Sequence, residues 1–124
     1  MTDDPIERIR AVCLAFPEAS EKTSWGTIPT FRVRDKIFAQ VEDNHHNSGR
    51  LALWCKAKPG MQALLVESQT GRFFRPPYVA HLGWIGIHLD FVLTSDQWDE
   101  IDDLIDDAYR LTAPKRILAA LDGR

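Results

Sequence analysis

The sequence predicts an α+β fold with a largely antiparallel five-stranded sheet and helices on one face, and three observations indicate it. The β-type runs are grouped instead of alternating with helices, in the order α-β(3)-α-β(2)-α. The 124 residues show no repeat, linker or low-complexity stretch, and their number suits a single domain over 1–124. A composition of 44% hydrophobic and 27% charged residues is ordinary for a globular chain and excludes a disordered one.

The first helix is expected to begin at Asp4 and Pro5, since Asp is a good N-cap and Pro suits the first helical position. Apolar residues then recur at helical spacing until Pro17 ends the helix. Residues 18–29 are polar and contain Gly and Pro, so we expect a loop there.

Three β-type runs follow, over 30–33, 37–41 and 51–56, and residues 34–36 join the first two as a tight hairpin. A short strand is expected over 73–75, where Pro76 and Pro77 end it. The fifth strand is expected over 84–89.

The remaining segments read as helices. A second helix should run from Pro59 to about Ser68. Ser95 is expected to cap a third helix over 96–111, because apolar residues line one side of that segment. A short last helix should begin at Pro114.

Side chains alternate between the two faces of a strand, so the strands that supply the core also assign an outer face. The outer face is predicted to hold Arg32, Phe38, Trp54, Lys56, Trp84 and His88. Aromatic rings among cations are typical of a surface that stacks bases and contacts phosphates, and also of a protein contact. Alternatively, segments 18–29 and 72–83 cover the two tryptophans and form a second small core.

Charge is distributed unevenly along the chain, although its formal net value is only −3. From Lys22 to Leu89 there are nine basic and four acidic residues, a balance of +5. From Phe91 to Leu111 there are seven acidic residues and one Arg, a balance of −6. A basic face and an acidic helix are therefore expected on different sides of the domain.

Several classes of protein are excluded or disfavoured. No apolar run approaches the ~20 residues that span a bilayer, so we expect no membrane partner. The two cysteines lie among apolar residues and are expected to be reduced in a cytoplasmic protein. The sequence offers no zinc-ligand cluster and no phosphate-binding glycine loop, so we expect neither a metal nor another cofactor.

Catalysis is not expected either. His81 and His88 flank Trp84, but a general base needs a nucleophile or a paired carboxylate, and only Asp90 is near in sequence. A small-ligand pocket between His81, Trp84 and His88 remains an alternative, provided that convergent polar groups line a cavity there.

Several stretches together resemble the MmcQ/YjbR family. They are Trp25-Gly26, residues 29–33, 36–39 and 53–56, then 73–79, His81, 83–86, Leu89-Asp90, 107–111 and 113–116. The resemblance covers nearly the whole chain in the same order. It implies an α-β(3)-α-β(2)-α fold similar to type III secretion chaperones. Members of the family are commonly labelled DNA-binding because the protruding hairpins of the sheet have been likened to a double wing, and the family has no agreed catalytic residues.

On this sequence the first wing is the hairpin at residues 34–36 and the second is the turn over 75–83. The residues expected to contact phosphates are Arg32, Arg34, Lys36, Lys56 and Arg75. Those expected to stack or wedge are Trp54, Trp84 or Tyr78, with His81 and His88 beside them. The leading expectation is DNA binding with little sequence preference. The alternative is a protein- or peptide-binding adaptor that uses the sheet face or edge.

Overall fold

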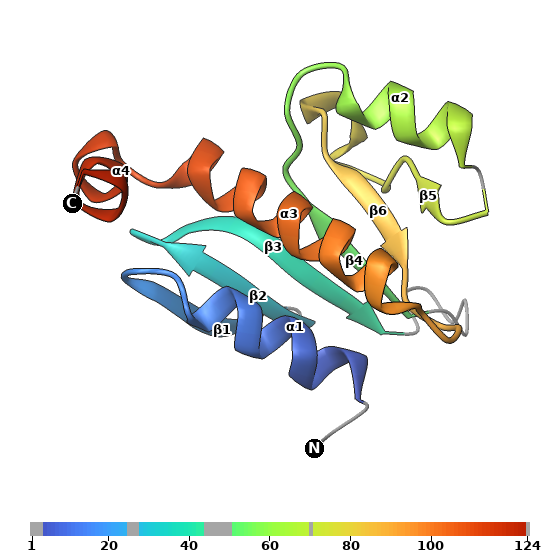
Figure 1. Cartoon of the computed structure of the whole chain (residues 1–124), viewed down its shortest axis with the longest axis horizontal. Coiled ribbons are helices and arrows are strands. Elements are labelled where there is room, and N and C mark those ends of the chain that lie inside the picture. Colours follow the sequence, from blue (N-terminus) through green and yellow to red (C-terminus); the bar gives the residue numbers. More distant parts are fainter. Residues whose placement is uncertain (1–3, 25–27, 44–50, 70, 124) are drawn as a thin grey trace.

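The chain folds into one antiparallel sheet with helices packed on it, as the computed structural model shows for residues 4–24, 28–43, 51–69 and 71–123 (Figure 1). The sheet has six strands in the order β1-β2-β3-β4-β6-β5. The strands are β1 (Ala19–Ser24), β2 (Ile28–Val33), β3 (Lys36–Asp43), β4 (Leu51–Cys55), β5 (Phe73–Phe74) and β6 (Ile85–His88). The helices are α1 (Pro5–Leu14), α2 (Met61–Ser68), α3 (Ser95–Thr112) and α4 (Lys115–Asp122), with a 3₁₀ turn η2 (Ala80–Leu82). The α+β class and the antiparallel sheet are confirmed.

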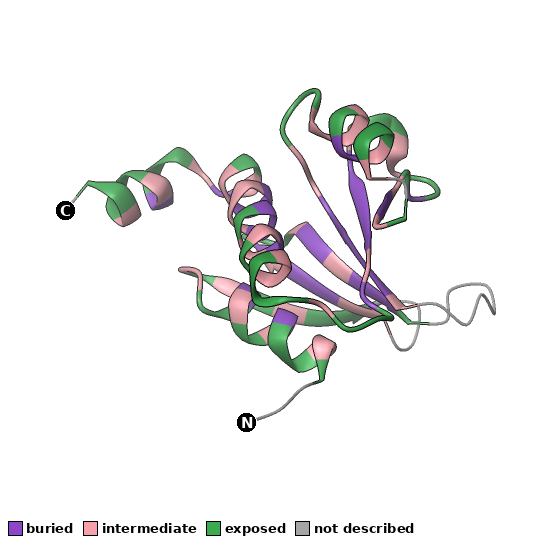
Figure 2. Ribbon diagram, turned by 45° about the vertical axis from the view of Figure 1, so that its right-hand side comes forward, coloured by how far each residue is buried: buried purple, intermediate pink, exposed green. Residues whose placement is uncertain are grey.

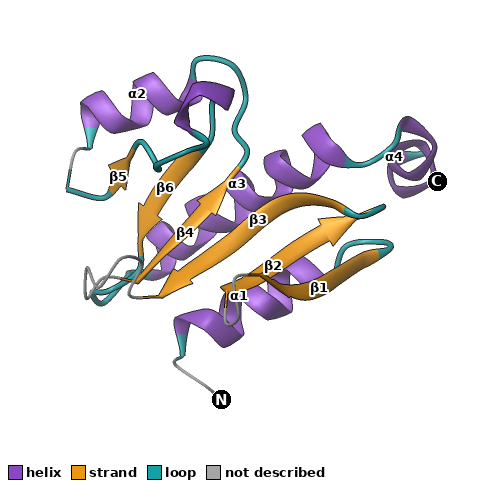
Figure 3. Ribbon diagram, turned by 180° about the vertical axis from the view of Figure 1, so that it is seen from behind, coloured by secondary structure: helices purple, strands orange, loops and turns teal. Residues whose placement is uncertain are grey.

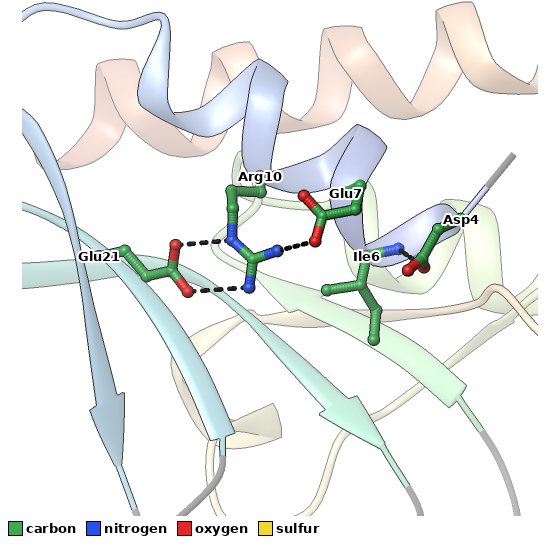
Figure 4. A network of polar contacts seen from close by, with 5 residues as sticks. All are labelled: Asp4, Ile6, Glu7, Arg10 and Glu21. Atoms are coloured by element: carbon green, nitrogen blue, oxygen red, sulfur yellow. Dashed lines mark hydrogen bonds and ion pairs between the residues drawn. The ribbon is translucent and has the colours of Figure 1, made fainter. Parts of the chain in front are cut away.

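The extra strand, β1, lies where a loop was predicted. All six of its residues pair with β2, from Ala19 opposite Val33 to Ser24 opposite Ile28. Arg10 of α1 holds this edge strand, because its Nε and Nη2 donate to the two carboxylate oxygens of Glu21 at 2.8 and 3.0 Å (Figure 4). A polar edge strand lacks apolar alternation, so neither its pairing with β2 nor its ion pair with Arg10 can be predicted from the local sequence.

The helix starts follow the capping rules, with one shift. Asp4 caps α1, since its Oδ1 accepts a hydrogen bond from the Ile6 amide at 2.9 Å. The cap of α3 is Thr94, so the prediction of Ser95 was wrong by one residue. Thr94 Oγ1 accepts from the Gln97 amide at 3.1 Å, while Gln97 Oε1 accepts from the Thr94 amide at 2.9 Å. This reciprocal capping box is possible only from Thr94, because Gln97 stands three residues after it.

The main core lies between one face of the sheet and helices α1 and α3, which lie behind the strands in Figure 3. Figure 2 shows the central strands mostly buried and the helices buried along one side only. An aromatic trio closes one end of this core. Tyr109 of α3 stacks on Phe16 at a centroid distance of 4.4 Å and meets the edge of Phe38 at 5.5 Å. Its hydroxyl donates to the Pro17 carbonyl at 2.7 Å, so this buried polar group is satisfied.

A β-bulge in β3 brings Phe38 into this core, which corrects its predicted place on the outer face. Ala39 pairs with Phe31 and Ile37 pairs with Arg32, so Phe38 between them is an extra residue without an opposite on β2. The bulge interrupts the alternation, and Phe38 and Ala39 both belong to the main core while Ile37 turns to the other face.

The second face of the sheet carries a small core of its own. Trp54 and Trp84 are only 4% and 6% exposed and pack with Ala52. Ile37, Phe74 and Val79 pack against them. The alternative reading, a second core under segment 72–83, is therefore the correct one for the tryptophans. The described residues of segment 18–29 do not cover them as that reading also proposed, because residues 19–24 form β1 at the sheet edge and residues 28–29 begin β2, while residues 25–27 lie outside the described part of the chain.

Gly86 allows the outermost strand to close over this small core. Phe74 of β5 pairs with Gly86 of β6, and its ring lies directly on the glycine. A Cβ at this position would stand 2.3 Å from Phe74 Cζ. The same ring stacks on His88 at a centroid distance of 4.6 Å, so Phe74 fills the space between the two β6 residues.

No helix in the described part of the chain is long and apolar enough to cross a membrane.

We expect Gly86→Ala to destabilise the protein by about 1–3 kcal/mol, because the added methyl group overpacks a filled site and must displace the Phe74 ring. Gly71→Ala is the matched control, since a Cβ there meets nothing within 4 Å. Urea denaturation followed by tryptophan fluorescence measures both variants. Equal stabilities would show that β5 does not close the second core.

Candidate functional site

The turn between β2 and β3 has an unusual backbone for its residues. Arg34 and Asp35 have φ values of 51° and 68°, which makes the turn a two-residue hairpin of the type that usually carries Asn-Gly. Glu18, just before β1, has a φ of 57°. Non-glycine residues with positive φ are uncommon, and side-chain contacts hold these three in place.

Ion pairs connect the three residues to their surroundings. Arg34 Nε donates to Glu18 Oε1 at 2.6 Å, and this bond lowers the pKa of Glu18. Lys22 Nζ donates to Asp35 Oδ1 at 2.7 Å and lowers the pKa of that carboxyl group. Glu18 and Asp35 therefore remain ionised at neutral pH. Arg34, which was predicted to contact phosphates, has a carboxylate partner in the free protein.

Arg32 is positioned along the second face of the sheet. Its Nε donates to Thr30 Oγ1 at 3.1 Å, and the Thr30 hydroxyl donates to the Lys22 carbonyl at 2.7 Å. Its Nη1 lies 3.9 Å from Asp35, and its side chain is 19% exposed. Arg32 is thus held in one orientation, and only its outer edge reaches solvent.

Lys36 and Lys56 form a pair of neighbouring cations. Lys36 begins β3, and Lys56 follows β4 with its amide bonded to the Phe38 carbonyl at 3.2 Å. Burial lowers the pKa of Lys56, and the charge of Lys36 lowers it further. Among the described residues, neither ammonium group forms an ion pair with a carboxylate. These two predicted phosphate contacts therefore carry charge that no carboxylate in the described part of the chain compensates.

We call a set of five cations at this end of the sheet, with the two carboxylates that pair with some of them, the basic end. Its members are Lys22, Arg32, Arg34, Lys36, Lys56, Glu18 and Asp35. Five positive and two negative charges give a net +3. Lys22 and Glu18 were not predicted as site residues, because they belong to the segment 18–29 that was predicted to be a loop. Only the pairing of β1 with β2 places them beside the hairpin.

The helix face has the opposite sign. α3 carries seven acidic residues and Arg110, a balance of −6, and it packs on the face of the sheet that holds the main core. A few cations compensate part of it, among them Arg8 at 3.6 Å from Asp102 and Arg72 at 2.6 Å from Glu100. The domain is therefore electrostatically two-sided, as the charge pattern of the sequence predicted.

The second predicted wing, residues 75–83, offers only Arg75 as a predicted phosphate contact. Arg75 lies 3.8 Å from Glu67 of α2, which compensates its charge. Tyr78 is 70% exposed and has a φ of 71°, so its ring projects from the surface on a constrained backbone. His81 in η2 is exposed. This wing offers an aromatic group to a partner and little net charge.

Three predicted contact residues do not reach a ligand as expected. Trp54 and Trp84 are buried in the second core, so neither can stack on a base. His88 is half-buried and stacked on Phe74. Phe74 packs against Trp84 and His88, two of the three residues between which the sequence suggested a small-ligand pocket. Sequence alternation places these residues on the correct face but cannot show that segment 72–83 covers them.

The described residues include no group of three or more His, Cys, Asp or Glu side chains that could hold a metal ion. The two cysteines are free and buried. Burial raises the pKa of the Cys55 thiol to about 12 and also raises that of Cys13, so both thiols stay protonated and unreactive.

Comparison with known proteins bears on the fold and the family. The crystal structure of Deinococcus radiodurans protein DR2400, with family-model domain DUF419, is similar with a TM-score of 0.70. The match covers 86% of this chain and 76% of that chain at 17% identity, which shows a common fold. No curated protein matches the sequence. The family model of YjbR matches residues 14–111, from the last residue of α1 almost to the end of α3, and the chain therefore belongs to the YjbR family.

Proposed function

We propose that this protein binds DNA with little sequence preference, and that the basic end supplies the phosphate contacts. The observation that carries the proposal is the Lys36–Lys56 pair, two neighbouring ammonium groups without a carboxylate partner among the described residues. A phosphate between them would relieve their mutual repulsion. Phosphate contacts of this kind position a protein on DNA but read no bases.

The other cations of the basic end extend this contact. Arg32 is fixed by Thr30, so it loses little side-chain entropy when it meets a phosphate. Arg34 can exchange Glu18 for a phosphate, because the pair is exposed and weak in water. Lys22 contacts Asp35 in the same exposed setting. Association would thus replace internal ion pairs with phosphate contacts and release counterions from the DNA.

Backbone conformation supports the same two regions. The four non-glycine residues with positive φ in the described part of the chain are Glu18, Arg34, Asp35 and Tyr78. Three belong to the basic end, and the fourth is the exposed tyrosine of the second wing. Constrained conformations of this kind are retained where the surroundings determine them, and they concentrate at functional sites. We assign Tyr78 a stacking or wedging contact with the DNA.

The acidic helix face determines which side of the domain the DNA approaches. DNA approaching α3 meets a negative potential and is repelled, whereas the basic end attracts it. This arrangement allows a protein of net charge −3 to bind a polyanion through one end.

The double variant Lys36→Ala/Lys56→Ala should bind a short labelled duplex more weakly than the parent. The slope of log K against log salt should become shallower by about 1.8, because each lost phosphate contact removes about 0.9. Fluorescence anisotropy between about 50 and about 200 mM salt measures both quantities.

Arg8→Ala/Arg72→Gln is the control for this variant. It removes the same net charge from the helix side of the domain, where both arginines already pair with acids of α3. An equal loss of affinity in the two double variants would contradict the assignment to the basic end. Absence of salt-dependent binding by the parent protein would refute DNA binding itself.

Glu18→Gln should increase the affinity for the duplex several-fold. The substitution keeps the shape of the side chain but removes the charge that compensates Arg34, so the arginine becomes available to a phosphate. The comparison is Glu67→Gln, which removes the acid beside Arg75 in the second wing. If Glu67→Gln increases the affinity more than Glu18→Gln, the second wing and not the hairpin supplies the main contact.

A further inference from the structure

A hollow lies on the acidic side of the domain, away from the basic end. It runs between α1 and the connection from β6 to α3, and its volume is about 970 Å³. This size is in the range of pockets that enclose small ligands or several side chains. Its apolar lining includes Ala11, Leu89, Phe91, Val92, Leu93 and Trp98.

The connection between β6 and α3 displays apolar side chains that the fold does not bury. Val92 is 96% exposed and Phe91 is 41% exposed. They stand between two anchors, since Leu89 is buried in the main core and Leu93 packs against it. The Leu89 amide also donates to the Leu51 carbonyl at 2.9 Å. Two exposed apolar side chains on an anchored segment beside an apolar hollow form a preformed surface, unlike a single exposed residue elsewhere.

The rim of the hollow is negative. Its charged lining residues are Glu7, Arg8, Asp90 and Asp99, and these three acids and one base give a formal net charge of −2. Arg8 pairs with Asp102, and Glu7 pairs with Arg10. The field is strong enough to act within the protein: burial raises the pKa of Asp102, and Asp99 and Asp103 raise it further against the opposing effect of Arg8.

Trp98 shows what this surface accepts. The guanidinium carbon of Arg8 lies 4.6 Å from the centroid of the Trp98 ring, while Arg8 Nη2 lies 3.6 Å from Asp102. An arginine is thus bound here by an aromatic ring and a carboxylate together, within the chain itself. Asp99, which lines the hollow beside Trp98, offers a carboxylate to a further cation.

From the apolar lining and the negative rim we infer that this hollow is a docking site for a basic, apolar peptide segment of a partner protein. Leucine-like side chains of the segment would occupy the hollow between Phe91, Val92 and Trp98, and its lysines or arginines would meet Asp99 and Glu7. The inference is independent of DNA binding, which was assigned to the basic end. It assigns a protein partner to the helix face instead of the sheet face or edge.

The test uses three labelled peptides that alternate arginine with leucine, glutamate with leucine, and arginine with serine. The arginine–leucine peptide should bind at least about tenfold more tightly than either of the others, because the hollow needs both positive charge and apolar side chains. Fluorescence anisotropy with the full chain gives the three affinities.

The variant Val92→Ser/Asp99→Lys should weaken binding of the arginine–leucine peptide by about tenfold or more. Its matched control is Leu64→Ser/Glu67→Lys on α2, which changes the same chemistry at exposed positions outside the hollow and should stay within about twofold. Both variants alter exposed side chains, and circular dichroism checks that the fold is retained.

Three results would overturn the inference. The first is equal binding of all three peptides, and the second is an equal loss of affinity in the two variants. The third is a concentration-dependent dimer, detected by sedimentation and abolished by Val92→Ser/Asp99→Lys, because a second copy of the chain would then be the occupant.

Discussion

The arrangement of both cores depends on the single extra residue in β3. With Phe38 inserted opposite the Phe31–Arg32 step, the strand directs Phe38 and Ala39 to the helices and Ile37 to the other side. Phe38 can then meet the edge of Tyr109, whose hydroxyl donates to the Pro17 carbonyl in the segment between α1 and β1. Ile37 packs against the core of the two tryptophans. A regular strand would expose a phenylalanine on the second face and remove one member of the aromatic trio. The bulge thus supplies packing to both sides of the sheet at one point.

Burial of the tryptophans also determines what the second face can do. Phe74 closes over Gly86 and β5 ends the sheet there, so the face that alternation suggested as an open aromatic surface is largely apolar packing. The charged groups of the basic end lie beside strands β1 to β3 and at the end of the sheet. A contact with a polyanion on this domain would therefore be made by cations and the projecting Tyr78, not by a stacking platform.

The hairpin and the preceding segment stabilise one another through opposite charges at constrained backbone positions. Arg34 and Glu18 both have positive φ and hold each other at 2.6 Å, while Asp35 is shared between Lys22 and Arg32. Exposed pairs of this kind contribute little to stability. On the far side, the acidic α3 and the anchored Phe91–Val92 segment provide a surface of opposite sign, so the two ends of the domain suit different classes of partner.

The sequence by itself determined the α+β class, the helix start at Asp4, the hairpin at residues 34–36 and the two-sided charge, because periodicity, capping and charge pattern are local properties. It also placed Trp54, Trp84 and His88 on the correct face by alternation. Only the tertiary structure decided that Phe38 turns inward, that residues 19–24 form an edge strand and that Phe74 covers the second face. Tertiary contacts likewise decided which cations are paired. Arg34 pairs with Glu18, whereas Lys36 and Lys56 have no ion-pair partner among the described residues. Each of these outcomes depends on residues distant in the chain that meet only after folding, and a local pattern carries no information about such a partner.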